Sequence, residues 1–391
     1  MRGKISKAKK RKTNLFLILL GIVILFVVGF IGYKIIIKHP ITSSFSASEQ
    51  QKLDDVVKTY RDKFPIPGVI AGIWVPKKGT YIKGYGVSDL ATQKAMDSYV
   101  SFRIASLTKT FVATVLLQLV DEGKINLDDP LNNYIKDSGI PNADAITVKQ
   151  LANMTSGLFD YPTDEVFGKL HDEDRTRFWE PKELISYATK HPPYFAPGTS
   201  YKYTNTNYIL LGMVIEKVTG NSLKDEIQNR ILTPLNLKNT YYAMDTILPR
   251  NSTHGYTDSI YQKNIDDVSI IGPSYAGAAG AMISNIEDLG VWAKAYGTGK
   301  LISKNAYQTQ TTWVDEPNSP QVKYGIGMMK VSNFIGHTGT IDGYNLSMFY
   351  EPMTKAAIVI VQTLNPGTAE GSADKIGFMM AKVVIPDRLW W

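Results

Sequence analysis

The chain has 391 residues, of which 44% are hydrophobic and 20% are charged, a composition typical of a globular protein with a sizeable core. Its formal charge of +7 comes from the N-terminus, because nine lysines and arginines precede His39 and the first acidic residue is Glu49, which leaves about −2 on the remainder. This distribution argues against a nucleic-acid interface, and the lack of cysteine in the sequence excludes disulfides, thiolate catalysis and cysteine-bound metals.

A basic tail and an apolar run precede the first predicted helix. Residues 1–14 are a predicted cytoplasmic tail and residues 15–37 a predicted transmembrane anchor, because Leu15 to Tyr33 contains no charge and spans about 28 Å as a helix. The run exceeds the roughly 7–15 apolar residues of a cleaved signal peptide, so an uncleaved anchor is favoured. The basic flank is expected to stay in the cytoplasm, which places the remainder outside the cell membrane, after a polar tether at 38–48.

The remainder, residues 49–391, is predicted to be one domain of the α+β class. A helix is expected at 49–63 after an N-cap at Ser48, helical patterns dominate 105–232, and a closing helix is expected at 375–384. Runs rich in β-branched and aromatic residues predict strands at 69–75, 80–87, 334–340, 344–350 and 356–363. This order predicts an antiparallel sheet built from both ends of the domain, flanked by N- and C-terminal helices, with an inserted mainly helical lobe.

Ser106 and Lys109 are the first candidate pair for chemistry. The apolar spacing of residues 111–120 predicts a helix with Ser106 in its first turn and Lys109 on the same face. A serine hydroxyl becomes a nucleophile when a neighbour takes its proton, and a lysine whose pKa is lowered by burial can do so. The pattern Ser-x-x-Lys also starts at Ser6 and at Ser372, and an N-cap is the ordinary use of such a serine.

Tyr203 and Asn205 form the second candidate. They occur in a polar loop before an apolar helix, and they make the only Tyr-x-Asn in the chain. A tyrosine hydroxyl near an ammonium group ionises more easily and serves as general base or acid, while an asparagine amide can hold a substrate carbonyl or the lysine. Because the chain has 22 tyrosines, a tyrosine that merely packs a loop is the alternative interpretation.

The third candidate is His337-Thr338-Gly339-Thr340, on or entering a predicted strand. Glycine would let a substrate backbone approach the strand closely, and the threonine hydroxyls would bind a carboxylate. The backbone N–H groups of Thr340 and Ser106 would form an oxyanion hole. A β-turn with an exposed histidine is the alternative.

Together these three elements predict a single reaction centre. Its catalytic residues are Ser106, Lys109, Tyr203 and His337, and its substrate-binding residues are Asn205, Thr338, Gly339 and Thr340. The five histidines show no metal-ligand spacing, and the Gly-x-Ser-x-Gly, His-Glu-x-x-His and P-loop motifs do not occur. Neither a metal nor another cofactor is therefore predicted.

The set Ser-x-x-Lys, Tyr-x-Asn and His-Thr-Gly resembles that of the serine β-lactamases and D-alanyl-D-alanine carboxypeptidases, the family of penicillin-binding proteins. The resemblance covers about residues 50–385 and makes 49–391 a β-lactamase-like catalytic domain. It implies that Ser106 attacks a D-Ala-D-Ala peptide bond of a peptidoglycan stem peptide, and that β-lactams acylate the same hydroxyl. Lys109 and Tyr203 would move protons, and which of them is the base stays open because a coupled pair shares its titration.

The resemblance also assigns the substrate-binding side. Asn205 would position the substrate amide, while His337, Thr338 and Thr340 would hold the terminal carboxylate. One stretch departs from the pattern: similar carboxypeptidases carry an arginine for that carboxylate on the preceding strand, where this chain has methionines at 328 and 329. Lys330 is expected on the opposite face of the strand.

Two other functions therefore remain open. One is an esterase, amidase or D-aminopeptidase on the same scaffold, including a hydrolase of D-alanyl esters. The other is a catalytically idle sensor of β-lactams or cell-wall fragments. The presence of all four predicted catalytic residues disfavours the sensor, because a binder needs no proton-transfer groups.

Overall fold

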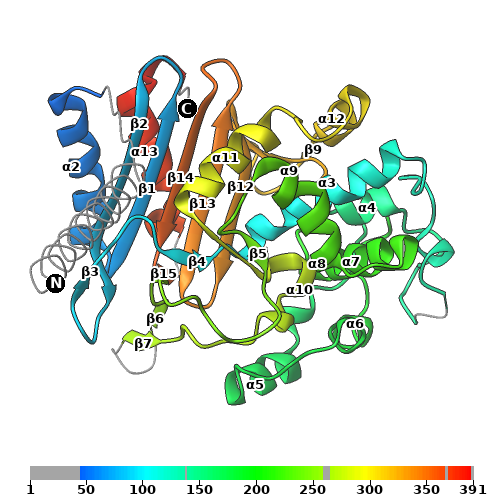
Figure 1. Cartoon of the computed structure of the whole chain (residues 1–391). Helices are drawn as coiled ribbons and strands as arrows, with labels where there is room; N and C mark the ends of the chain where they lie inside the picture. Colours follow the sequence, from blue (N-terminus) through cyan, green and yellow to red (C-terminus); the bar gives the residue numbers. More distant parts are fainter. Residues whose placement is uncertain (1–44, 137–138, 259–264, 366–368, 389–391) are drawn as a thin grey trace, which may run out of the picture. The chain divides into compact units, whose positions relative to one another are not determined.

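A nine-stranded antiparallel sheet forms the centre of the structure, a computed structural model that describes residues 45–136, 139–258, 265–365 and 369–388 (Figure 1). From one edge to the other its strands are β3 (Lys94–Ala95), β2 (Gly79–Asp89), β1 (Gly68–Val75), β14 (Ala356–Gln362), β13 (Tyr344–Glu351), β12 (Phe334–Ile341), β11 (Met329–Val331), β10 (Val322–Tyr324) and β9 (Val314–Asp315). β1 pairs with β14 from Val69 opposite Gln362 to Trp74 opposite Ala357. The predicted α+β class, with both ends of the domain in one antiparallel sheet, is confirmed.

The N-terminal helix begins earlier than predicted. In α2 (Ala47–Lys63) the N-cap is Ser46, not Ser48: the Ser46 hydroxyl accepts the Glu49 N–H at 3.2 Å, and the Glu49 carboxylate accepts the Ser46 N–H at 2.9 Å. This reciprocal capping box fixes the start of the helix, so the predicted N-cap at Ser48 is wrong. The predicted tail, the anchor and the tether up to residue 44 lie outside the described residues. Within the described ranges, no helix is both long and apolar enough to span a bilayer.

One face of the sheet is covered by the two terminal helices, as predicted. α13 (Ala373–Val384) starts two residues before the predicted position and packs against α2, β13 and β14. Burial of each large apolar side chain in this layer contributes roughly 1.5–3 kcal/mol. The fully buried side chains of the layer include Leu53, Val57, Ile358, Ile360, Ile376 and Met380.

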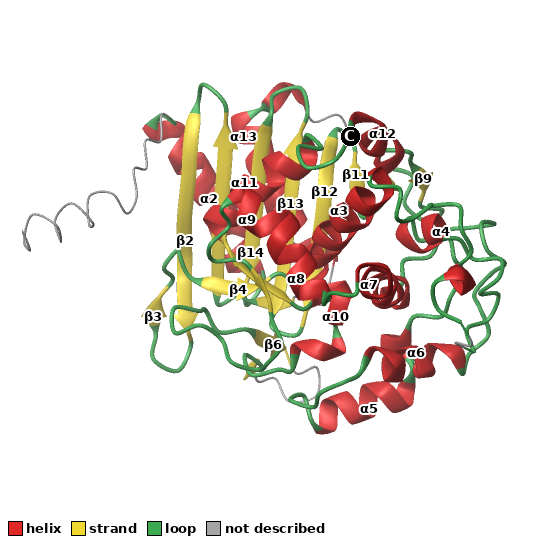
Figure 2. Cartoon of the chain, turned by 45° about the vertical axis from the view of Figure 1, so that its right-hand side comes forward, coloured by secondary structure: helices red, strands yellow, loops and turns green. Residues whose placement is uncertain are grey.

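The other face of the sheet carries the mainly helical lobe, and α11 contacts β1, β13 and β14 (Figure 2). The helices of this side are α3 (Thr108–Asp121), α4 (Val148–Ala152), α5 (Glu165–Glu173), α6 (Pro181–Thr189), α7 (Asn205–Thr219), α8 (Leu223–Ile227), α9 (Thr233–Leu235), α10 (Gly277–Gly280), α11 (Ile286–Gly297) and α12 (Lys304–Gln310). α3 is hydrophobic on nearly every face, because it is packed between the sheet layer and the other helices.

Short elements connect these layers. Single turns are η1 (Ala105–Leu107), η2 (Leu131–Asn133), η3 (Tyr161–Thr163), η4 (Gln228–Leu232), η5 (Pro273–Tyr275), η6 (Ala369–Gly371) and η7 (Pro386–Arg388). Two small sheets have the orders β4 (Ser101–Arg103), β8 (Met282–Asn285), β5 (Tyr241–Tyr242) and β15 (Leu364–Asn365), β6 (Tyr256–Asp258), β7 (Ile265–Asp267). β12 contacts η1, and α3 contacts α7, so the chain from η1 into α3 lies between the sheet and the helical lobe.

Candidate active site

Ser106 lies in η1, directly before α3. The turn is unusual because Ala105 has φ +49°, a left-handed conformation that costs a non-glycine residue about 1 kcal/mol or more. Neither η1 nor α3 uses a side-chain cap, so Ser106 is not the ordinary N-cap that its position allows. Ala105 and Leu107 are buried while Ser106 is only partly buried, which leaves its hydroxyl accessible at the junction of turn and helix.

Lys109 faces the hydroxyl of Ser106. Its Nζ is hydrogen-bonded to Ser106 Oγ at 3.0 Å, to Asn205 Oδ1 at 2.8 Å and to the Ala279 carbonyl at 2.9 Å. The side chain is 0% exposed, and this burial lowers the pKa of Lys109 to about 7, against a smaller opposing effect of the Asp160 charge. A substantial fraction of the amine is therefore neutral near pH 7 and able to take a proton from Ser106.

Tyr203 completes the contact with Ser106. Its ring centroid lies 4.9 Å from Lys109 Nζ. Burial raises the pKa of Tyr203 well above its ordinary value, and the nearby Ser106 side chain offsets only part of this effect. The expected easier ionisation does not occur, because burial outweighs the nearby ammonium. Burial therefore favours the protonated phenol of Tyr203 at neutral pH.

His337 lies behind Tyr203 as a neutral ring. Its Nδ1 donates to the Thr338 carbonyl at 2.5 Å, so Nε2 accepts the hydroxyl of Tyr324 at 2.9 Å. Burial, with the positive charge of Lys109, lowers the pKa of His337 to about 3. The ring centroids of His337 and Tyr203 are 6.1 Å apart. His337 therefore supplies no positive charge at neutral pH and instead contacts Tyr203 and Tyr324. Tyr324 is not among the residues predicted from the sequence.

Gly339 allows β12 to approach the turn that carries Ser106. A Cβ at this position would lie 2.9 Å from the Ile104 carbonyl oxygen and 3.1 Å from Ala105 Cβ, closer than side-chain carbons normally come. The pairing of β11 with β12 runs from Phe334 to Gly336, so the strand continues past η1 beyond the end of β11. The glycine of the His-Thr-Gly motif is therefore required by packing in the protein itself.

Thr338 and Thr340 point to the face of the sheet opposite the one on which Gly339 meets η1, because side chains alternate along a strand. Thr340 Oγ1 accepts the Asn345 amide at 2.9 Å, and Thr338 Oγ1 lies 3.5 Å from Met329 Sδ. Both threonines line a cavity of about 590 Å³ on the α13 side, together with Met329 and α13 residues. These two hydroxyls thus share a cavity with Met329, and the oxyanion hole stays a prediction.

Asp160 is a member of the group that the sequence analysis missed. Its carboxylate accepts the Asn205 N–H at 2.6 Å, the Thr204 hydroxyl at 3.2 Å and the Asn205 side-chain amide at 3.4 Å. It lies at the N-terminus of α7, where the helix dipole favours a negative charge. Asp160 lies outside the three predicted motifs, so none of them pointed to it.

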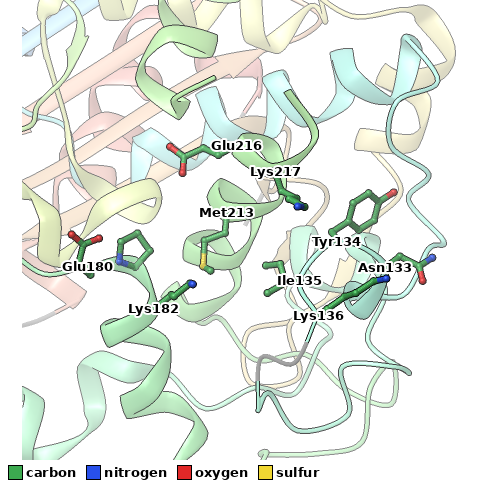
Figure 3. Close-up of a pocket in the computed structure, with 10 residues that line it drawn as sticks. Asn133, Tyr134, Ile135, Lys136, Glu180, Lys182, Met213, Glu216 and Lys217 are labelled. Atoms are coloured by element: carbon green, nitrogen blue, oxygen red, sulfur yellow. The ribbon is translucent and has the colours of Figure 1, made fainter. Parts of the chain in front are cut away.

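A separate cavity of about 1080 Å³ lies between the segment after η2, the start of α6 and the outer side of α7 (Figure 3). Three lysines and two glutamates surround its apolar residues, Ile135 and Met213. None of its lining residues belongs to the group around Ser106, so this cavity is not part of the reaction centre. No cluster of three or more histidine, aspartate or glutamate side chains suited to a metal ion occurs in the ranges that the structure describes.

Comparisons with known proteins agree with this geometry. Residues 53–377 match the Beta-lactamase family. The chain is 26% identical to Protein flp of Staphylococcus aureus (strain MW2) over 329 residues, covering 81% of this chain but only 63% of the length of that relative. A solved D-stereospecific amidohydrolase from Streptomyces sp. is 33% identical, with a TM-score of 0.76 over 87% of this chain and 98% of that one. A solved D-amino acid amidase from Ochrobactrum anthropi SV3 is 26% identical, with a TM-score of 0.71 over 86% and 99% of the two chains.

Proposed function

The chain belongs to the β-lactamase family of serine hydrolases, and on this premise we propose that it hydrolyses D-amino-acid amides or peptides with an uncharged leaving group through an acyl-enzyme at Ser106. The observation that carries this proposal is the 3.0 Å contact between Ser106 Oγ and a fully buried Lys109. The likeness to the amidohydrolase and the amidase supports the choice of substrate class. An idle sensor fits poorly, since a binder gains nothing from a buried amine beside a serine.

The proposed reaction has two stages, acylation and deacylation. In acylation the neutral Lys109 amine takes the Ser106 proton while Oγ bonds to the substrate carbonyl carbon. The C–N bond then breaks, and the proton on Lys109 reaches the departing nitrogen by way of the Tyr203 hydroxyl. In deacylation a water oxygen attacks the ester, its proton passes through the same groups, and Ser106 Oγ is protonated as it leaves. Asn205 holds Lys109 and the substrate amide.

The leaving-group preference rests on Met329. It lies beside the Thr338 hydroxyl, at the place where a carboxypeptidase arginine is expected, and it carries no charge. Lys330 points away from Thr338, to the face of the sheet that carries His337, and its Nζ lies 5.7 Å from the Trp313 ring centre. His337 itself is neutral. A D-Ala-D-Ala carboxypeptidase, with covalent β-lactam binding, is therefore the second candidate, favoured by the shared Tyr-x-Asn and His-Thr-Gly motifs.

The cellular setting is part of the same proposal. An anchor at residues 15–37 would hold the domain outside the cell membrane, where peptidoglycan stem peptides, related D-amino-acid compounds and β-lactams are encountered. The charge distribution of the sequence is the support for this orientation.

We expect Met329→Arg to raise turnover of a D-Ala-D-Ala peptide by about tenfold, because a charge-assisted contact with the terminal carboxylate is worth roughly 1–2 kcal/mol at a partly exposed site. The wild-type chain should instead prefer a D-amino-acid amide. The measurement is kcat/KM for both substrates, by release of D-alanine and of ammonia. Met353→Arg is the matched control, since Met353 is 75% exposed and lies in the turn between β13 and β14. Equal peptide turnover in the wild-type and Met329→Arg chains would remove Met329 from the argument.

The rate of acylation should rise with pH and level off above about pH 7. Because burial lowers the pKa of Lys109 to about 7, the lysine is an ammonium below that pH and cannot accept the Ser106 proton. Tyr203 has a raised pKa, so it remains protonated and causes no decline at moderately alkaline pH. Initial rates between about pH 5 and 9 test this, with thermal melts at each pH as the control for folding. A flat profile across that range would show that Lys109 is not the base.

A further inference from the structure

The carboxylate of Asp160 fixes the orientation of the Asn205 amide. Asn205 Nδ2 faces Asp160 Oδ2 at 3.4 Å, which leaves Asn205 Oδ1 facing Lys109 Nζ at 2.8 Å. If the amide were turned over, its NH₂ group would meet the donors of Lys109 and its oxygen would meet a carboxylate. Both contacts would be repulsive. Asp160 therefore selects the amide orientation that holds Lys109 beside Ser106.

Asp160 also supplies a negative charge that raises the pKa of Lys109. The hydrogen-bond partners of Lys109 are uncharged: the Ser106 hydroxyl, the Asn205 amide and the Ala279 carbonyl. The other groups that face it are the rings of Tyr203 and Tyr208, at 4.9 and 5.7 Å from Nζ, and the neutral His337. Among the described residues, Asp160 is the one carboxylate that acts on the pKa of Lys109, and it raises that pKa.

The carboxylate is held between opposing effects. The pKa of Asp160 is raised, because burial outweighs the hydrogen bonds from Asn205 and Thr204 and the charge of Lys109, which lower it. Three donors and the N-terminus of α7 stabilise the ionised form. Asp160 and Lys109 thus form a coupled pair, in which the charge of one favours the charge of the other.

We propose that Asp160 is a positioning residue: it fixes the Asn205 amide against Lys109, and its negative charge sets the pH above which Lys109 can activate Ser106. This inference rests on the proposed function, because it concerns the same acylation step. Asp160 acts through Asn205 and Lys109 and makes no bond to the reacting atoms.

The test is Asp160→Asn, with acylation of Ser106 by p-nitrophenyl acetate, an uncharged ester without an amine, followed as a burst of p-nitrophenol. Loss of the negative charge makes the Lys109 ammonium less favourable, so the acidic limb of the pH profile should move down by on the order of one pH unit. The plateau rate should fall roughly tenfold, because the Asn205 amide is no longer held in one orientation. Intact-mass analysis of the trapped adduct verifies that Ser106 is the residue acylated.

Asp288→Asn is the matched control. Asp288 is a buried carboxylate near a helix start, and it accepts the Asn239 N–H and the Thr240 hydroxyl, each at 2.8 Å. Its loss should lower the melting temperature without moving the acidic limb. Asp160→Ser, which also removes the charge, replaces Asp160→Asn where the latter shows no cooperative melt.

Three results would decide against the inference. An acidic limb that stays at the wild-type pH in a folded Asp160 variant would refute the role of its charge. A defect confined to KM for D-phenylalanine p-nitroanilide, which carries an amine, would mean that Asp160 touches the substrate. The wild-type chain alone provides a further check: an acidic limb more than about one unit below pH 7 would contradict the proposed effect of the Asp160 charge on Lys109. Absence of an adduct in the wild-type chain would instead refute the proposed function.

Discussion

Replacement of Ser106 by alanine is expected to abolish acyl transfer, lowering kcat/KM by roughly four orders of magnitude or more. Ser106 Oγ accepts a hydrogen bond from Lys109 Nζ at 3.0 Å, and Tyr203 lies near the same side chain, so both proposed proton-transfer groups are next to it. The fold should survive, because the Ser106 side chain caps neither η1 nor α3. We expect the free energy of unfolding to change by about 1 kcal/mol or less.

The measurement is intact mass after incubation with benzylpenicillin and, separately, with an activated D-amino-acid ester. The wild-type chain should gain one acyl group and Ser106→Ala none. Ser372→Ala is the matched control, since Ser372 and Lys375 repeat the Ser-x-x-Lys spacing at the start of α13. An adduct that persists in Ser106→Ala would move the nucleophile to another residue.

Lys109→Met should slow acylation by about a thousandfold, the range for loss of a general base. Methionine keeps the length and apolar stem of lysine but removes the amine that accepts the Ser106 proton. The free energy of unfolding should change less than the rate, because two effects oppose each other. Removing the buried amine relieves its desolvation cost, whereas Asn205 Oδ1 and the Ala279 carbonyl lose their hydrogen-bond donor. Stopped-flow acylation and urea unfolding measure the two effects separately.

The pair Lys109→Met and Tyr203→Phe tests whether the two residues act as a unit. Each single change should cost nearly as much as the double change, because Tyr203 returns a proton that Lys109 has first accepted. Strict additivity of the two free-energy losses would mean that the groups act independently. Lys375→Met serves as the control for the loss of a lysine from a Ser-x-x-Lys sequence.

The sequence predicted well what depends on local spacing. The period of residues 111–120 placed Ser106 and Lys109 on one face, and the strands from 334 to 363 appear as β12, β13 and β14. The start of α2 was predictable and was missed, because Ser46-Ala47-Ser48-Glu49 already contains the Ser-x-x-Glu of a capping box. β9 and β10 were missed for a different reason: strands of two or three residues beside Pro317 and Pro320 depend on their neighbours in the sheet.

The electrostatic state of the site could not be predicted from the sequence. Tyr203 was expected to ionise more easily, and burial prevents this. Burial also keeps His337 neutral. Asp160 was overlooked because its influence on Lys109 depends on how the loop before η3 folds against α7. Motifs supply the residue types of a reaction centre, whereas the surrounding packing decides the protonation state of each member.

The pairing of β1 with β14 has a consequence for the timing of synthesis. A ribosome that has just finished α7 has already made the serine, the lysine, the tyrosine and their supporting aspartate. Two strands come much later: β12, which packs against η1, and β14, which pairs with β1. Contacts between such distant segments form slowly, since a long loop must close before they gain any stability. We therefore expect the proposed reaction centre to stay incomplete in the nascent polypeptide until translation has supplied the last strands.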